Sequence, residues 1–274
     1  MILARDLLDE ASRTVDRADA EFMLMTLLDV GRHALGLGTT AVAPGLAAAF
    51  RRMLPAAASG TPPQYLVGNA PFLDFALHVD PRVLIPRPET EGLVSMTLER
   101  VGDPRLVIDY GTGSGCIAIA LGRALPNARV LAVDASAGAL AVARLNVDRH
   151  RLADRIELLQ ASSLADPRLA RLEGEVDLLV SNPPYVPTGR LRWLAPRVRD
   201  HEPQTALDGG PNGTNILLML LKQGPALLAP GGLMALEIDD DHAALLRAAA
   251  PGARFERDLA GRTRYVFLGK EPAP

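Results

Sequence analysis

From residue 105 onward, apolar and polar positions alternate in blocks that have the lengths of strands and helices. Longer segments separate these apolar runs, and two of them predict helices: the small-residue segment at 116–125 and the segment at 137–149. Strands that alternate with helices are typical of a parallel sheet covered on both faces, which binds its ligand at the carboxyl ends of the strands. The apolar runs predict strands at 105–110, 128–134, 155–160, 176–181 and 232–238.

The first part of the chain has a different pattern. Apolar residues recur at helical spacing in the clusters 22–28 and 46–54, with breaks that contain glycine and proline between them. We therefore expect a helical N-terminal domain over residues 1–60.

A connector is expected next, at residues 61–87. Prolines and partly alternating positions between Thr61 and Ile85 indicate a short β-hairpin there. An amphipathic helix with acids in its first turn follows from Glu89 to Arg100. The catalytic domain is then expected to occupy residues 88–274.

Composition narrows the class of protein. Of the 274 residues, 48% are apolar and 22% charged, which fits a packed globular protein and not a disordered or fibrous one. The net charge of -3 is too small to predict bulk attraction to nucleic acid or to a membrane. Acids in the first ten residues, no membrane-length apolar run and a lone Cys116 lead us to expect a cytoplasmic protein.

A glycine-rich turn, DYGTGSG, lies between the strand at 105–110 and the helix that follows it. Glycines at alternate positions permit backbone conformations closed to other residues and let a ligand come close to the main chain. The turn therefore predicts a site for a nucleotide-type cofactor. The residues that we assign to this site are Gly111, Thr112, Gly113, Ser114 and Gly115.

The next strand ends in Asp134, whose carboxylate is placed to accept hydrogen bonds from both hydroxyls of a ribose. Dinucleotide-binding enzymes use such an acid too, so a nicotinamide-dependent oxidoreductase is one alternative. Their fingerprint G-x-G-x-x-G would need its third glycine at Cys116. The form G-x-G-x-G is common in methyltransferases that use S-adenosylmethionine, although a structural turn without any ligand also stays open.

The strand at 176–181 ends in a second unusual turn, the NPPY turn at residues 182–185. Its two prolines fix φ and carry no N–H, so the turn presents carbonyls in a nearly fixed arrangement. The Asn182 side-chain oxygen and the Pro183 carbonyl can accept both hydrogens of a planar amino group, on which the Tyr185 ring stacks. The nitrogen is then aligned for in-line attack on a sulfonium methyl group. We assign Asn182, Pro183, Pro184 and Tyr185 to catalysis.

With both turns in hand, the chain resembles the protein-(glutamine-N5) methyltransferases, in particular the HemK/PrmC-type enzymes that modify bacterial peptide chain release factors. The resemblance covers nearly the whole chain, and its PRPETE and ALDGG segments are more specific than either turn alone. The matching segments are PPQYLVG (62–68), VLIPRPETEGLV (83–94), DYGTGSGCIAIAL (109–121), SNPPYVP (181–187), HEPQTALDGGPNG (201–213), APGGLMALEI (229–238) and DLAGRTRYV (258–266).

The resemblance implies a class I S-adenosylmethionine-dependent methyltransferase fold, with a Rossmann-like seven-stranded sheet whose last strand is antiparallel. It also implies that the helical N-terminal domain at 1–60 binds substrate and helps to hold the substrate protein. It implies S-adenosylmethionine as the donor, S-adenosylhomocysteine as the product, and the glutamine amide of a Gly-Gly-Gln loop in release factors as the acceptor. By position, Asp134 would hold the ribose and Asn182 would contact both cofactor and glutamine. We expect a monomer that acts on a protein and binds neither nucleic acid nor membrane directly.

The sequence departs from the family pattern at three places. Beyond the third strand, where the family often has an acid followed by an aromatic residue, this chain has Ser162 and Ser163, and Ser163 is the cofactor contact that we expect. The segment EIDDDH lacks the glycine that usually follows EI in similar proteins, and His201 stands in place of an aromatic ring.

Other acceptors and other roles stay open at this stage. A relative in the same family class methylates a glutamine of a large-subunit ribosomal protein, and a flipped adenine amino group would suit the same turn. A non-catalytic binding module is a further alternative. Arg87, Glu89 and Glu91 either line the pocket or form a rigid connector and a solvated helix start. The five histidines lack metal-ligand spacing, so we expect no metal.

Overall fold

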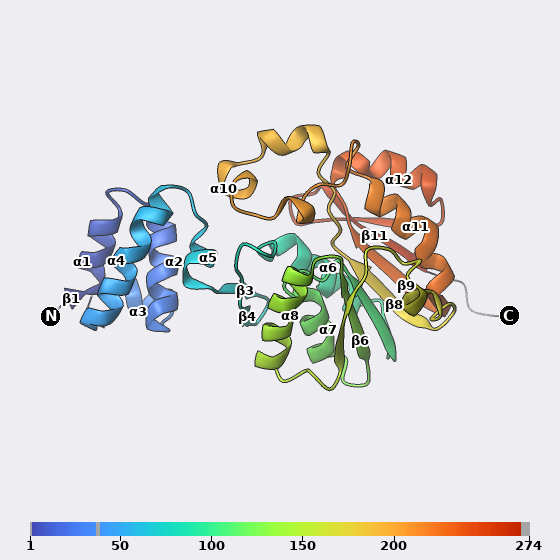
Figure 1. Ribbon diagram of the computed structural model, residues 1–274, viewed down its shortest axis with the longest axis horizontal. Coiled ribbons are helices and arrows are strands. Elements are labelled where there is room, and N and C mark those ends of the chain that lie inside the picture. Colours follow the sequence, from blue (N-terminus) through green and yellow to red (C-terminus); the bar gives the residue numbers. More distant parts are fainter. Residues whose placement is uncertain (1, 37–38, 270–274) are drawn as a thin grey trace.

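The apolar runs predicted as strands all lie in one seven-stranded sheet (Figure 1). The structure is a computed structural model that describes residues 2–36 and 39–269, so the last residues of the expected catalytic domain lie outside the described part. The strand order is β10-β11-β9-β8-β5-β6-β7, and β11 runs antiparallel to both neighbours, as the resemblance implies. The strands are β5 (Leu106–Tyr110), β6 (Arg129–Asp134), β7 (Ile156–Gln160), β8 (Val176–Ser181), β9 (Leu228–Glu237), β10 (Arg254–Arg257) and β11 (Thr263–Gly269).

Strand β5 lies at the point where the order of the parallel strands reverses, because it pairs with β6 on one side and with β8 on the other. The carboxyl ends of these strands therefore meet at one edge of the sheet, where such folds bind ligands. A hydrogen bond from the Ser181 hydroxyl to the Tyr110 carbonyl, 2.6 Å long, joins the ends of β8 and β5. The two turns predicted to carry chemistry are thus neighbours in space.

Helices cover both faces of the sheet, as the alternation of strands and helices predicts. Buried residues of α6, α7 and α8 form one core with one face, and those of α9, α11 and α12 form a second core with the other. Side chains at successive strand positions point to opposite faces, so Val107 joins the first core and Ile108 the second. The helices are α6 (Pro88–Leu98), α7 (Cys116–Ala124), α8 (Ala137–Arg149), α9 (Pro167–Ala170), α11 (Asn215–Leu227) and α12 (Ala243–Ala249).

The N-terminal helices form a lobe to one side of the sheet, with their own core around Phe50 and Met23 (Figure 1). The helical unit continues past residue 60, because Leu66 and Val67 of α5 pack against that core. We therefore propose to end the N-terminal unit at Gly68. Its elements are β1 (Ile2–Leu3), α1 (Ala4–Ala11), α2 (Arg17–Leu28), α3 (Arg32–Gly36), β2 (Ala41–Val42), α4 (Pro44–Ala58) and α5 (Pro63–Val67).

The predicted hairpin connects the two lobes. Its strands β3 (Ala70–Phe72) and β4 (Phe75–Leu77) pair antiparallel, and the chain then reaches α6 through an irregular segment. In the described part of the chain, no helix is long and apolar enough to cross a membrane.

A long insertion between β8 and α11 reaches back toward the N-terminal lobe (Figure 1). Its α10 places Arg197 against Asp19 of α2, where the guanidinium donates two hydrogen bonds to the carboxylate. The insertion contains the short helices η1 (Thr188–Trp193), α10 (Pro196–Arg199) and η2 (Gln204–Ala206), and η3 (Asp240–His242) follows β9 later in the chain.

Candidate active site

A cavity of about 460 Å³ opens at the carboxyl edge of the sheet, between the glycine-rich turn at 111–115 and the NPPY turn. Its volume lies in the range of pockets that hold cofactor-sized ligands. The connector, the sheet edge and the long insertion each contribute to its wall. Residues that line it include Arg82, Leu84, Arg87, Thr90, Tyr110, Gly111, Thr112, Gly113, Ser114, Cys116, Ile117, Asp134, Ser136, Ala139, Ser162, Asn182, Pro184, Pro203, Thr205 and Ile216.

The glycine-rich turn is held mainly by its own backbone. Gly111, Gly113 and Gly115 have φ angles of 75°, 55° and 84°, in the left-handed region that glycine adopts without a steric penalty. The amides of Gly111 and Thr112 both donate to the Val133 carbonyl, at 2.8 and 2.9 Å. Gly115 does not line the cavity; it begins α7, and a Cβ there would stand 3.5 Å from Ala143 of α8.

Two carboxylates support this turn. Asp134 accepts the amide of Gly113 at 2.9 Å and that of Ser136 at 2.8 Å, so its side chain is fixed at the cavity wall. Burial raises the pKa of Asp134. Behind the turn, the fully buried Asp109 accepts the Thr112 hydroxyl at 2.6 Å and the Ala118 amide at 3.0 Å. Burial raises the pKa of Asp109 to about 7.

The NPPY turn divides between the cavity and the protein interior. Asn182 and Pro184 line the cavity, whereas Pro183 is buried and Tyr185 packs at the border of the second core. The Tyr185 hydroxyl donates to Glu237 at 3.1 Å, and burial raises the pKa of this phenol above its ordinary value. Tyr185 does not line the cavity, so its stacking on the acceptor stays a prediction. Its contacts hold the turn in place.

Behind Asn182 lies a buried polar group that the sequence did not reveal. The Asn182 amide nitrogen donates to the Thr90 hydroxyl at 2.9 Å, and that hydroxyl donates to Glu237 at 2.8 Å. Thr90 belongs to the PRPETE segment and Glu237 ends β9, so the turn is fixed by residues far away in the chain. Burial raises the pKa of Glu237 to about 7, and the Thr90 and Tyr185 hydroxyls oppose this shift.

Arg87 at the end of the connector and the two acids at the start of α6, Glu89 and Glu91, have different positions. Arg87 lines the cavity and donates to Glu202, a buried carboxylate that also accepts the Ile85 amide at 3.2 Å. Glu91 points away from the cavity and accepts the Leu73 amide at 2.8 Å. Glu89 does not line the cavity either, so Arg87 is the one member of these three residues that does.

Of the two serines beyond β7, the structure places Ser162 on the cavity wall and not Ser163. The Ser163 oxygen instead accepts the amide of Ala165 at 3.1 Å, because the chain turns there toward α9. Ser162 therefore lines the cavity in the place where Ser163 is expected to.

No group of three or more His, Cys, Asp or Glu side chains within the described ranges could hold a metal ion. Cys116 lies at the inner wall of the cavity, and burial raises the pKa of its thiol to about 12. The thiol therefore stays protonated at neutral pH and is a poor nucleophile.

The donors and acceptors of the cavity suit a nucleoside with an amino-acid tail. Carboxylate oxygens of Asp134 keep lone pairs for ribose hydroxyls beside the amides of Gly113 and Ser136. Apolar side chains such as Ile117 and Ile216 offer surfaces for a base. Together these residues fit S-adenosylmethionine.

Comparison with known proteins identifies relatives along most of the chain. Family models match twice: the methyltransferase small domain over residues 90–193 and the PrmC N-terminal domain over residues 2–68. The release factor glutamine methyltransferase of Moorella thermoacetica is 45% identical over 232 residues, which cover 81% of this chain and 80% of that protein. The protein of the same name from Deinococcus radiodurans is 37% identical over 277 residues, 96% of each chain.

Among solved structures, the 16S rRNA N2 G1207 methyltransferase of T. thermophilus, in complex with AdoMet and guanosine, shares the fold. The TM-score is 0.53 at 20% identity, over 74% of this chain and 50% of that one. This likeness and the matched methyltransferase domain confirm the expected class I methyltransferase fold.

Proposed function

The chain belongs to the family of release factor glutamine methyltransferases, and we propose that it methylates the side-chain amide nitrogen of a glutamine in a peptide chain release factor. The acceptor glutamine would be that of the Gly-Gly-Gln loop, as the family resemblance implies. One observation carries the proposal. A single cavity has the glycine-rich turn on one side and the Asn182 amide with Pro184 on the other, so donor and acceptor meet within it.

S-adenosylmethionine, when bound, would supply an electrophilic methyl group on a sulfonium. We assign its binding to Asp134 for the ribose, to the turn at 111–115 for the amino-acid tail, and to Ser162 rather than Ser163 near the base. S-adenosylhomocysteine would be the product. We propose that the protein acts as a monomer, because one chain supplies both the glycine-rich turn and the NPPY turn.

Asn182 would hold the acceptor. Its amide nitrogen is engaged by Thr90, so its oxygen is left to accept a hydrogen from the glutamine amide. The Pro183 carbonyl would accept the second hydrogen, because a proline pair fixes the carbonyl directions of the turn. An amide nitrogen is a weak nucleophile, so this alignment and the polar surroundings must supply most of the acceleration.

Two other methyl acceptors would be detected by the experiment described below. A glutamine in a large-subunit ribosomal protein would use the same turn, and so would an adenine amino group of a nucleic acid. The names of the relatives favour the release factor, and the small net charge of -3 gives no general attraction to nucleic acid.

The test uses the purified chain, methyl-labelled donor and each acceptor in parallel: release factor, ribosomal protein, duplex DNA and RNA. We expect label in the release factor alone. Label only in the ribosomal protein or only in nucleic acid would overturn the proposal.

A further inference from the structure

A buried hydrogen-bonded chain runs from the catalytic turn to the end of β9. The Asn182 amide nitrogen donates to the Thr90 hydroxyl, which donates to Glu237. The second carboxylate oxygen of Glu237 accepts the Tyr185 hydroxyl. Thr90 is 2% exposed and Glu237 is 0% exposed, so water does not compete for these contacts. Three distant segments of sequence thus meet behind one side chain of the site.

The groups at the two ends of this series of hydrogen bonds differ in chemistry. The difference fixes which group donates and which accepts in each bond. An ionised carboxylate can only accept hydrogen bonds, so the single hydroxyl proton of Thr90 is committed to Glu237. The Thr90 oxygen is then free only to accept, and of the two ends of the Asn182 amide only the nitrogen can donate. The Asn182 oxygen is therefore turned to the other side, toward the cavity.

We propose that Thr90 and Glu237 are positioning residues for methyl transfer, which fix the orientation of the Asn182 amide so that its oxygen faces the acceptor. This inference rests on the proposed function, because it assigns these residues to the same reaction. Without the carboxylate, the Thr90 hydroxyl could equally donate to the Asn182 oxygen. The amide nitrogen would then face the acceptor, and two N–H groups would oppose each other.

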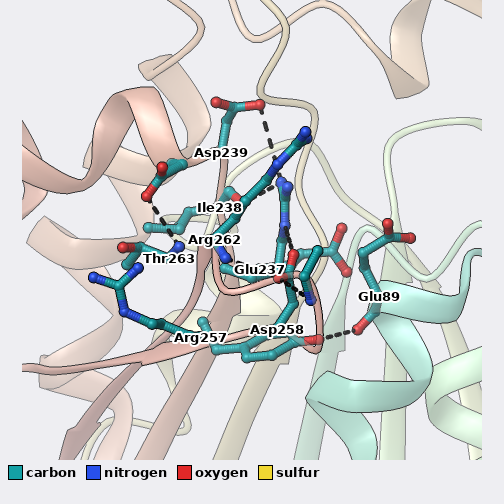
Figure 2. A network of polar contacts seen from close by, with 12 residues as sticks. Glu89, Glu237, Ile238, Asp239, Arg257, Asp258, Arg262 and Thr263 are labelled. Carbon is teal, nitrogen blue, oxygen red and sulfur yellow. Dashed lines mark hydrogen bonds and ion pairs between the residues drawn. The ribbon is translucent and has the colours of Figure 1, made fainter.

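The surroundings of Glu237 favour an orienting role over a stabilising one. Burying a carboxylate is costly unless its charge is paired, and no ion pair to Glu237 exists within the described ranges. Arg264 faces it from β11 but is hydrogen-bonded to the Ile238 carbonyl and to Asp258. Figure 2 shows Glu237 among polar contacts that join the end of β9 to the turn between β10 and β11.

The titratable groups that face Glu237 are Arg264 of β11, Glu89 of α6, the Cys116 thiol of α7, and the phenols of Tyr185 and Tyr265. Arg264 favours the ionised carboxylate, whereas Glu89 and burial oppose it. Once Glu237 takes up a proton it can donate to Thr90, and the direction of the chain is no longer fixed. Correct orientation of Asn182 is therefore expected above the pKa of Glu237, which is about 7.

The test compares Thr90→Val with Thr90→Ser in the full-length protein, with the release factor as acceptor. Valine keeps the shape of threonine but cannot relay a hydrogen bond, whereas serine can. For Thr90→Val we expect kcat to fall about 10- to 100-fold, because a buried hydrogen bond to the charged Glu237 is lost. Donor affinity, measured by calorimetry, should change less than about twofold, and Thr90→Ser should stay near the wild type.

Glu237→Gln supplies an independent arm that keeps the volume of the side chain. We expect a lower kcat. We also expect kcat of the wild type to rise between about pH 6 and pH 8, and this rise to be absent in Glu237→Gln. A wild-type kcat in Thr90→Val, an equal defect in Thr90→Ser, or the same pH profile in Glu237→Gln would each overturn the inference. Absence of label in the release factor with the wild-type protein would instead overturn the proposed function.

Discussion

The two turns at the carboxyl edge of the sheet perform related tasks by different means. The glycine-rich turn has left-handed glycines, and its supports are the Val133 carbonyl and the carboxylates of Asp134 and Asp109, on the adjacent strands β6 and β5. The NPPY turn depends on more distant residues: its Asn182 is bonded to Thr90, which lies 92 residues away, and through it to Glu237. The first turn is therefore supported by the two strands that flank it, and the second by α6 and the end of β9.

Removing the oriented group itself should have the largest effect. Asn182→Ala deletes the oxygen that would accept from the glutamine amide, so we expect methyl transfer to fall by roughly 100- to 1,000-fold or more, as when an enzyme loses one preorganised transition-state contact. Asn127→Ala, at an exposed position, is the matched control. Turnover with labelled donor measures both, and wild-type turnover in Asn182→Ala would contradict the assigned role.

Each turn has a buried carboxyl group behind it, Asp109 or Glu237. We expect the contribution of these two groups to folding stability to depend on pH. Burial raises the pKa of Asp109 and of Glu237 to about 7, so the native state binds these protons more tightly than the unfolded chain. Their contribution to stability is complete below the unfolded pKa of about 4 and is lost as pH rises through about 7.

We expect that loss to be on the order of 3 kcal/mol for each group. Denaturant unfolding of the wild type, Asp109→Asn and Glu237→Gln across this range measures it. As pH rises from about 4 to about 7, the unfolding free energy of the wild type should fall relative to that of each variant. A difference that is constant with pH would show that these carboxylates do not titrate as described.

A methyl group added to the glycine-rich turn should affect binding of the donor. Gly113→Ala forces an L-residue into φ of 55°, at a cost of about 1–2 kcal/mol, and adds a carbon at the cavity wall. Gly231→Ala carries the same strain, at φ of 80°, away from the cavity. We expect both to lose stability in thermal unfolding and only Gly113→Ala to lose donor affinity in calorimetry. Equal donor affinities in the two variants would argue against this site.

The smallest effect is expected from Tyr185→Phe. The ring that packs at the border of the second core remains, while the hydroxyl that donates to Glu237 is lost. We expect a fall in kcat of a few-fold, since one of the two hydroxyl contacts of the carboxylate persists. A loss as large as that of Asn182→Ala would mean that the phenol itself touches the acceptor.

The sequence predicted the parts of this architecture that depend on local pattern. Apolar runs located β5, β6, β7, β8 and most of β9, and the spacing of glycines located the cofactor turn. The strands β10 and β11 were not identified from their own residues. Strand β10 is only four residues long, and the apolar run at 265–268 in β11 was overlooked. Helix α5 was missed because its prolines resemble those of a connector.

The candidate site was predictable only as far as its contacts are local. Asn182 and Asp134 were found because Asn182 follows β8 and Asp134 ends β6, both at the ligand edge of the sheet. Thr90 was overlooked within PRPETE, since its hydroxyl matters through contacts with residues 92 and 147 positions away. The single signal available was a small polar residue in the first turn of an otherwise apolar helix face. Ser163 and Ser162 differ by one position, which no pattern resolves.

The central claim is that this cavity joins a methyl donor to a glutamine amide. Mass spectrometry of a release factor incubated with the protein and S-adenosylmethionine tests it most directly. We predict one added methyl group, located by fragmentation on the glutamine side chain of the Gly-Gly-Gln peptide, and none with Asn182→Ala. An unmodified Gly-Gly-Gln peptide, or a methyl group on any other residue, would contradict the account.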